Sequence, residues 1–192
     1  MQFEKAVQYI LDKQSKVLSP DLCYHNIDHI KDVYEAARQI GTAEGVTAHE
    51  LQLLLTAASY HDAGYLKQAK AHEEESCRIA RTVLPEFEYT PEDIERICGM
   101  IMATRLPQTP HNHLEQILAD ADLDYLGRDD FFTTGQQLFA ELQNFGNIGS
   151  ENDWNAMQVK FVESHQYFTQ TSIQQRQAKK DENLAAVKSK IK

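Results

Sequence analysis

The segment SYHDAG, residues Ser59–Gly64, places a histidine and an aspartate side by side at the end of a helical pattern. The apolar residues before it are spaced as on one face of a helix: Leu51, Leu54, Leu55 and Ala58. His61 lies seven residues after Leu54 and Asp62 lies seven after Leu55, so both continue this inward face. A carboxylate that points inward must be paired, hydrogen-bonded or bound to a metal ion, or it loses its charge. The segment therefore predicts a helix whose buried end carries polar groups that need partners.

Helical patterning extends from this segment toward the N-terminus, and no stretch alternates with the two-residue period of a strand. We expect a first helix that starts at Phe3 and closes before Ser19–Pro20. A second helix is expected to be capped by Asn26 and ended by Gly41. The third helix, which leads into SYHDAG, opens with a capping box at Thr47–Glu50.

The pattern toward the C-terminus is also helical. The expected helices are, in chain order, Ser76–Val83 before Pro85, Thr90–Ile101, Asn112–Leu126 before Gly127, Phe131–Leu142, Trp154–Phe168, and a solvated helix prone to fraying in the last twenty residues. The sequence therefore predicts an all-α fold with additional C-terminal helices. We expect residues 1–192 to form one domain, with a core at about 20–130 and a helical extension at about 131–192.

The composition limits the classes of function. Of the 192 residues, 42% are hydrophobic and 25% are charged, which is typical of a globular protein with a sizeable core. The net charge of -10 argues against broad binding of a nucleic acid polymer, although a bound divalent metal ion could still attract a small phosphate. Cys23, Cys77 and Cys98 have no CxxC spacing, so we expect reduced thiols without a disulfide or a zinc–thiolate site. Without a signal peptide or a long apolar run, we expect a cytoplasmic protein that makes no membrane contact.

Further residues of metal-ligand type fall near the inward faces of other helices. His29 lies four residues before Val33, on the flank of the apolar stripe of the second helix. His25 lies one turn earlier, just outside that helix. His72 lies seven residues before Ile79, on the buried side at the start of the fourth helix.

Three aspartates compete for the inward position of the sixth helix. Asp122 lies four residues after Leu118 and so follows the apolar stripe. Asp120 points further from that stripe, and Asp124 lies on its opposite flank. Helical phase favours Asp122 over Asp120 but only weakly over Asp124, so a contribution from either neighbour stays open.

Each of these residues has a simple structural explanation when it is taken alone. A single inward histidine is usually a hydrogen-bonded core residue. We expect His49, His111 and His113 to be solvated or capping residues, and acids such as Glu73 to reflect helix-dipole and solvation effects. Several inward groups on three helices, however, predict a shared ion. Two imidazoles and two carboxylates suit Mn, Mg, Fe, Ni, Co or Zn with positions left open for water and substrate.

The order His29, His61–Asp62, Asp122 resembles the HD superfamily of metal-dependent phosphohydrolases, which is named for the adjacent His–Asp pair. The flanking stretches YHDAGYL, HEEESCRIARTVLPEF and ILADADLDYLG agree, and the resemblance covers about residues 20–130. It implies an all-α HD-domain fold in which these four side chains bind one divalent metal ion. Asp122 is preferred as the last ligand because it occupies the family's Ala–Asp position before an apolar residue.

The stretch YHNIDHIKDV, residues Tyr24–Val33, is similar to the YHNxxHxxDV segment of cyclic-nucleotide phosphodiesterases. This resemblance implies that His29 binds the metal and that His25 donates a proton to the leaving oxygen. A histidine beside the metal but not bound to it suits general acid catalysis, because imidazole ionises near neutral pH.

The chain also departs from its relatives. His72 matches the first of the extra histidines of binuclear HD enzymes, so it is a candidate for a second metal or for substrate. The later helix reads ICGMIMATR, and its lack of histidine argues against the di-iron site of the oxygenase branch. The long phosphodiesterase catalytic domain with its nucleotide-clamping glutamine is not recognisable, so cyclic-nucleotide specificity is not carried over.

Together these features predict the hydrolysis of a phosphate mono- or diester, either a nucleotide or another small phosphorylated metabolite, by metal-activated water. His25 and Asp62 are the expected catalytic residues. Four basic residues are candidates for phosphate binding, although each is more often a surface charge: Lys67, Lys70, Arg105 and Arg128.

Three alternatives compete with this hypothesis. The chain could be a catalytically weak or inactive regulatory module that binds metal or nucleotide, an iron oxygenase, or a helical adaptor without metal. The sequence does not name the substrate or the oligomeric state. Pocket walls are expected around the C-terminal residues Phe131, Trp154, Phe161 and His165, where no transferable motif occurs.

Overall fold

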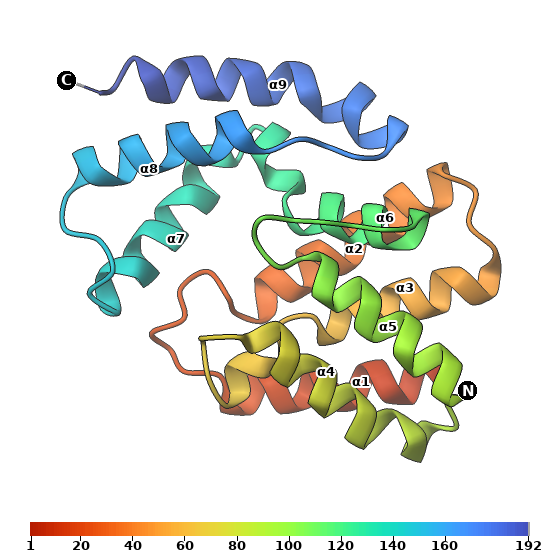
Figure 1. Cartoon of the computed structure of the whole chain (residues 1–192). Helices are drawn as coiled ribbons and strands as arrows, with labels where there is room; N and C mark the ends of the chain where they lie inside the picture. The colour runs from red at the N-terminus through yellow and green to blue at the C-terminus, as the bar shows by residue number, and fades with distance from the viewer. Residues whose placement is uncertain (192) are drawn as a thin grey trace.

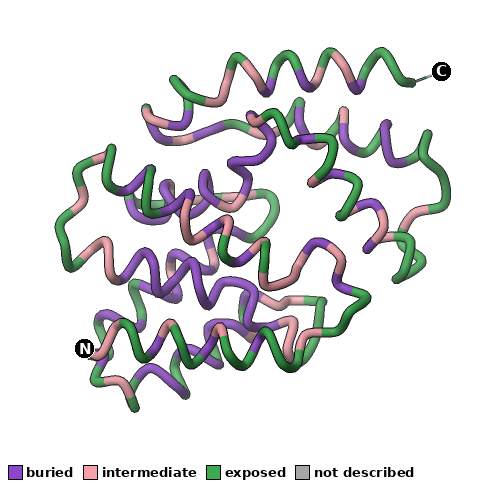
Figure 2. Tube along the Cα trace, turned by 180° about the vertical axis from the view of Figure 1, so that it is seen from behind, coloured by how far each residue is buried: buried purple, intermediate pink, exposed green. Residues whose placement is uncertain are grey.

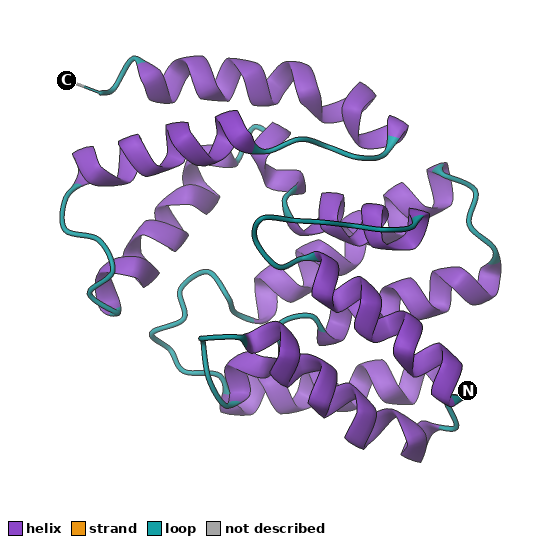
Figure 3. Ribbon diagram, viewed as in Figure 1, coloured by secondary structure: helices purple, strands orange, loops and turns teal. Residues whose placement is uncertain are grey.

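The computed structural model describes residues 1–191, and within this range the chain is all α-helical without a strand (Figure 3), as predicted. The helices are α1 (Phe3–Val17), α2 (Ile27–Ala43), α3 (Ala48–Tyr60), α4 (His72–Val83), α5 (Pro91–Ala103), α6 (His113–Asp122), α7 (Phe131–Asn144), α8 (Glu151–Ser164) and α9 (Gln170–Lys188). Three short 3₁₀ turns connect some of them: η1 (Ala63–Leu66), η2 (Leu84–Phe87) and η3 (Asp124–Gly127).

The predicted helix caps are present. The Asn26 side chain accepts hydrogen bonds from the backbone N–H groups of Asp28 and His29 at the start of α2. Thr47 and Glu50 form a reciprocal capping box at α3. The caps therefore fix where the helices that carry the histidines begin.

The predicted ends of the second and sixth helices were wrong. α2 continues past Gly41 to Ala43, and Gly41 is instead buried where a Cβ would lie 2.8 Å from Leu54 Cδ2. This glycine permits close packing of α2 on α3, and the chain turns at Gly45, which has a positive φ of 73°. The sixth helix ends at Asp122, and the chain continues to Gly127 as the turn η3.

The hydrophobic residues form two cores. The larger core is built from α1 to α6, which lie together in one part of the molecule (Figure 1). The smaller core lies where α7, α8 and α9 meet η3 and includes Tyr125, Phe131, Val162 and Val187. Figure 2 shows buried residues along the inner sides of these helices and exposed ones along their outer sides.

The C-terminal helices differ from their sequence patterns. α8 ends at Ser164, so the predicted continuation to Phe168 was wrong. α9 is packed against the rest of the chain, in contrast to the expected solvated helix. Asn183 is 5% exposed and donates hydrogen bonds to the carbonyls of Leu126 and Arg128. Polar residues of α9 are thus buried because they satisfy backbone groups of η3 and its neighbour, which hydrophobic periodicity does not reveal.

No helix among residues 1–191 is both long and apolar enough to cross a lipid bilayer.

Candidate metal centre and adjoining cavity

Four side chains from three helix ends meet at one point of the fold. His29 lies in the first turn of α2, His61 caps the C-terminus of α3, Asp62 follows it, and Asp122 is the last residue of α6. His61 Nε2 lies 3.3 Å from Asp62 Oδ2 and 3.4 Å from Asp122 Oδ1. His29 Nε2 lies 3.6 Å and 3.3 Å from the same two oxygens. The sequence-predicted ligand set is therefore brought together.

The atoms that face one another here are buried and have no hydrogen-bond partners. His29 Nε2, His61 Nε2 and Asp62 Oδ2 are all in this state. His61 Nδ1 lies 2.8 Å from the carbonyl oxygen of Ala58, a contact in which the ring nitrogen must donate its proton. In neutral His61, Nε2 therefore presents a lone pair to the centre of the group.

The donor set and its spacing fit a single divalent metal ion. Two nitrogen or oxygen atoms bound to one ion at about 2.1 Å lie about 3 to 3.5 Å apart. The contacts between the imidazole nitrogens and the carboxylate oxygens fall close to this range. The candidate ligand atoms of His29, His61 and Asp122 form the tightest group, all within 4.8 Å of one another. Asp62 completes the group at a slightly greater spread, and a cation at the centre would give every one of these atoms a partner.

The electrostatics of the group also favour a cation. Burial disfavours the charged form of His61, but the nearby Asp62 and Asp122 carboxylates outweigh it and raise the His61 pKa. Burial likewise opposes ionisation of Asp122, yet the adjacent His29 and His61 imidazoles hold its pKa below the usual range. Positive charge is thus favoured at this point, whether as a proton or as a metal ion.

The neighbours of Asp122 have structural partners of their own. Asp120, which helical phase directs further from the apolar stripe, is fully buried and accepts hydrogen bonds from the backbone N–H groups of Phe168 and Thr169. Asp124 forms an ion pair with Arg176 at 2.7 Å. Because α6 ends at Asp122, helical phase does not apply beyond it, and only Asp122 faces the histidines.

His72 borders the metal group from the start of α4. Its Nε2 lies 3.3 Å from Asp62 Oδ1, the oxygen that faces away from His29 and His61. Glu73 is also buried, in contrast to the solvated role expected from the sequence, and its Oε1 lies 3.7 Å from His72 Nε2. Asp62 thus stands between the first metal group and a second polar pair.

His25 is held beside the metal group by a residue that the sequence analysis missed. Glu141 of α7 accepts hydrogen bonds from the backbone N–H groups of Tyr24 and His25, and its Oε1 lies 2.5 Å from His25 Nδ1. Burial raises the Glu141 pKa, but these hydrogen bonds outweigh it, so the net pKa lies below the ordinary value. The ring of His25 also stacks on Tyr65 at 4.4 Å between ring centroids. Because Nδ1 contacts Glu141, Nε2 is the ring nitrogen of His25 that is left for other contacts.

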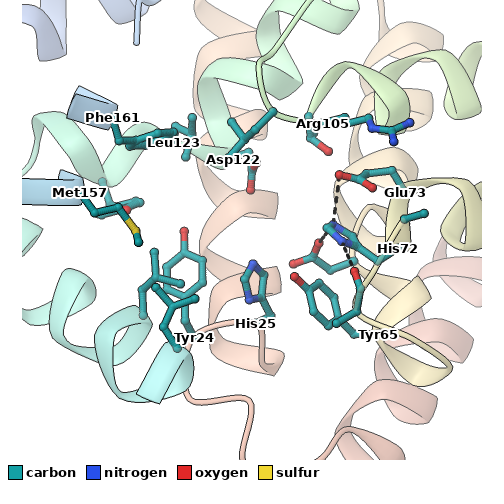
Figure 4. A pocket seen from close by; sticks show the side chains of 18 of the residues that line it. Tyr24, His25, Tyr65, His72, Glu73, Arg105, Asp122, Leu123, Met157 and Phe161 are labelled. Atoms are coloured by element: carbon teal, nitrogen blue, oxygen red, sulfur yellow. Dashed lines mark hydrogen bonds and ion pairs between the residues drawn. The ribbon is translucent and has the colours of Figure 1, made fainter. Parts of the chain in front are cut away.

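A cavity of about 480 Å³ opens beside these residues (Figure 4). His25, Asp62, His72 and Asp122 line it, whereas His29 and His61 lie behind them. Among the basic candidates, Arg105 lines the cavity and pairs with Glu74. Lys67, Lys70 and Arg128 do not line it, and Arg128 pairs with Asp32 at 2.8 Å.

Two of the four expected wall residues line this cavity. Trp154 and Phe161 do, whereas Phe131 lies in the smaller core and His165 borders a separate hollow. Glu141 had a weak signal in the sequence, since it lies three residues after Leu138 on the inward face of α7. Its partner lies 116 residues away, so only the tertiary structure pairs it with His25.

Comparisons with known proteins agree with this geometry. A model of the HD domain family matches residues 26–124. No curated protein sequence matches the chain.

Two crystal structures are similar to the fold. One is a predicted HD superfamily hydrolase from an uncultured Thermotogales bacterium, 22% identical, with a TM-score of 0.60 over 96% of this chain and 87% of that chain. The other is a Lactobacillus plantarum protein, 19% identical, with a TM-score of 0.67 over 99% of this chain and 98% of that chain. At such identities the likeness establishes a shared fold.

Proposed function

Because the chain belongs to the HD domain family, we propose that it is a metal-dependent phosphohydrolase that acts on phosphate mono- or diesters of small metabolites, nucleotides among them. The observation that carries this proposal is the set of buried, unpartnered atoms His29 Nε2, His61 Nε2 and Asp62 Oδ2 beside Asp122. Leaving such atoms buried without partners costs free energy, and a divalent metal ion would remove that cost.

The proposed metal ligands are His29, His61, Asp62 and Asp122. A divalent ion held there would lower the pKa of a water molecule and withdraw charge from a phosphoryl oxygen. His72, with Glu73 beside it, would hold a second ion or contact the substrate, because its Nε2 faces the free oxygen of Asp62. Arg105 is the proposed phosphate contact, since it is the candidate base that lines the cavity.

His25 is the proposed proton donor to the leaving oxygen. The Glu141 carboxylate accepts a hydrogen bond from His25 Nδ1 and holds the ring at the cavity, so Nε2 would be the nitrogen that donates to the leaving oxygen. Tyr65 packs flat against the ring and restricts its rotation. These contacts support the role of His25 as an oriented acid next to the point where the scissile bond would lie.

The proposal is tested by metal analysis together with a phosphatase screen. Protein purified without chelator is analysed for Mn, Fe, Co, Ni, Zn and Mg, and then assayed with nucleotides, cyclic nucleotides and sugar phosphates. We expect His61→Ala to lose the metal and all turnover, because His61 is 1% exposed at the centre of the group. His111→Ala, which changes an exposed histidine outside the group, is the matched control.

Equal metal content in wild type and His61→Ala would reject the site. Tight nucleotide binding without phosphate release in any of these metals would instead support a regulatory module.

A further inference from the structure

The cavity beside the metal group has two chemically different halves. Arg105, Glu73, His72 and Tyr65 lie on one side of Asp122 and His25, and Met157, Phe161 and Leu123 lie on the other (Figure 4). The second half is completed by side chains of α7 and α8, among them Leu138, Leu142 and Trp154. Tyr24 and Tyr125, with ring centroids 5.8 Å apart, also line the cavity.

The wall formed by α7 and α8 contains no charged side chain. Its members are Leu138, Leu142, Trp154, Met157 and Phe161, and the indole N–H is the only side-chain hydrogen-bond donor among these five. The Trp154 ring stacks on Phe139 at 5.7 Å between centroids, which fixes it as a flat surface. Met157 remains 43% exposed, so part of this apolar wall is open to a ligand.

The charges of the cavity limit where a substrate can carry its own charge. Glu73, Asp62 and Asp122 are acidic, and among residues 1–191 Arg105 is the only lysine or arginine that lines the cavity. Arg105 is itself paired with Glu74. The cavity therefore offers one place for a phosphoryl group, on the side lined by Arg105 and the metal group, and no second lysine or arginine among residues 1–191 for a further phosphate.

The proton donor connects the reacting bond to the apolar wall. Glu141, which holds His25, belongs to α7. Leu138 and Leu142, which precede and follow Glu141 in the same helix, both line the cavity. A leaving oxygen protonated by His25 consequently has its organic group next to this wall.

We propose that the substrate is a single phosphoryl group esterified to an apolar alcohol whose carbon skeleton occupies the wall of α7 and α8. This inference rests on the proposed hydrolase function and narrows its substrate class. Water supplies the oxygen that bonds to phosphorus while the ester P–O bond breaks. The leaving oxygen takes a proton from His25 Nε2, and a proton from the attacking water restores His25. The products are inorganic phosphate, or a phosphomonoester when the substrate is a diester, and the free alcohol.

Binding can be tested without turnover because Trp154 is the single tryptophan of the chain and lines the apolar wall. Ethyl-, butyl- and hexylphosphonate, which are not hydrolysed, are titrated into the Mg²⁺-loaded protein while tryptophan fluorescence is recorded. We expect the Kd to fall about fourfold for each added methylene group, as the chain leaves water. A Kd independent of chain length would overturn the proposal, as would tighter binding of dihydroxypropyl phosphonate or of a nucleoside diphosphate than of hexylphosphonate.

Paired variants assign the effect to this wall. Met157→Gln is expected to reduce the preference for hexyl- over ethylphosphonate at least threefold, and its exposure makes the change compatible with folding. Ile173→Gln, which alters an equally apolar residue that is 37% exposed on α9 and does not line the cavity, is expected to have no effect. An unchanged preference in Met157→Gln, or the same loss in both variants, would count against the wall.

Hydrolysis of ethyl and hexyl phosphate separates the two proposals. Chain-length-dependent phosphonate binding without hydrolysis of any phosphate ester would reject the phosphohydrolase function and retain the apolar binding site. Hydrolysis of both esters with equal kcat/KM, together with binding that ignores chain length, would retain the function and reject the apolar substrate.

Discussion

Glu141 gives His25 its position and its charge environment. Its carboxylate accepts hydrogen bonds from the backbone N–H groups of Tyr24 and His25, and it contacts Nδ1 of the His25 ring. A glutamine in its place could still accept from the backbone but would bring no negative charge to the imidazole. Glu141 is therefore a positioning residue for the proposed acid.

For Glu141→Gln we predict that kcat falls about tenfold to hundredfold while the metal content stays that of wild type. Esters whose leaving group needs protonation should lose the most, because the oriented proton donor acts only on them. The kcat values for an alkyl phosphate and for p-nitrophenyl phosphate, together with metal analysis, measure this difference. Equal loss of kcat on the two esters would indicate a purely structural role.

For His25→Ala we predict retained metal and a loss of kcat of about 10² to 10⁴, the range for removal of a general acid. The loss should be largest for substrates with a poor leaving group and small for p-nitrophenyl phosphate, whose leaving group needs little protonation. Equal losses on alkyl and nitrophenyl esters would contradict the assignment. Metal analysis serves as the control for the integrity of the site.

At the scale of elements, the turn η1 lies between Asp62, which follows α3, and His72, which begins α4. Ser76 Oγ of α4 donates to the carbonyl of His61 at 2.6 Å and accepts from the N–H of Gly64 at 2.7 Å. A Cβ on Gly64 would lie only 2.0 Å from the carbonyl oxygen of His72. The glycine thus allows α4 to pack directly against the turn that carries Asp62.

For Gly64→Ala we predict destabilisation by about 1 to 3 kcal/mol or more, because the obstacle is backbone and cannot rotate away. The displaced start of α4 should also carry His72 away from Asp62 and weaken metal binding. Urea unfolding measures the first effect and metal titration the second. Gly149→Ala is the control, since its Cβ would meet only ordinary contacts at 3.7 Å. Equal stability of the two variants would contradict this packing argument.

The end of α6 also determines which aspartate reaches the metal group. The α-helix stops at Asp122, and the chain turns into η3 at Asp124. Asp120 is consequently directed to the start of α9 and Asp124 to Arg176, while Asp122 meets His29 and His61. Three aspartates spaced two residues apart therefore serve three different purposes.

At the scale of the whole molecule, the C-terminal helices form one wall of the cavity and bury polar groups of their own. His165, which follows α8, has a pKa lowered to about 3, first by burial and then by the nearby Lys180 ammonium. Lys180 Nζ donates to the His165 carbonyl at 2.7 Å. The folded protein therefore keeps this imidazole neutral in mildly acidic solution.

The consequence is a loss of stability as the pH falls. Below about pH 6.5 the unfolded chain protonates this histidine and the folded chain does not, so stability is lost progressively from about pH 6.5 toward pH 3. Between pH 7.5 and pH 5, we predict that the free energy of unfolding falls by about 1 to 2 kcal/mol less in His165→Gln than in wild type. Urea unfolding of both proteins in EDTA, which removes metal-linked protonation, measures the difference. Equal losses would contradict the prediction.

The sequence by itself determined the helical class, the caps and the ligand types, because these depend on local periodicity and on side-chain chemistry. Asn26 and the Thr47–Glu50 box act within one turn of chain, so their effect is readable from neighbouring letters. The spaced order of His29, His61–Asp62 and Asp122 resembles the HD family, and a model of that family matches residues 26–124. The exact end of α2 was not readable, because Gly41 is placed by its packing against Leu54 of α3.

Only the tertiary structure decided the partners of the buried polar groups. Glu141 meets His25 across 116 residues, Asp120 meets Thr169 across 49, and Asn183 meets Leu126 across 57. Helical phase distinguishes inward from outward faces but does not show which distant polar atom lies opposite. Because a buried polar group is stable only with a partner, the fold, and not the local pattern, determines whether such a residue is structural, catalytic or metal-binding.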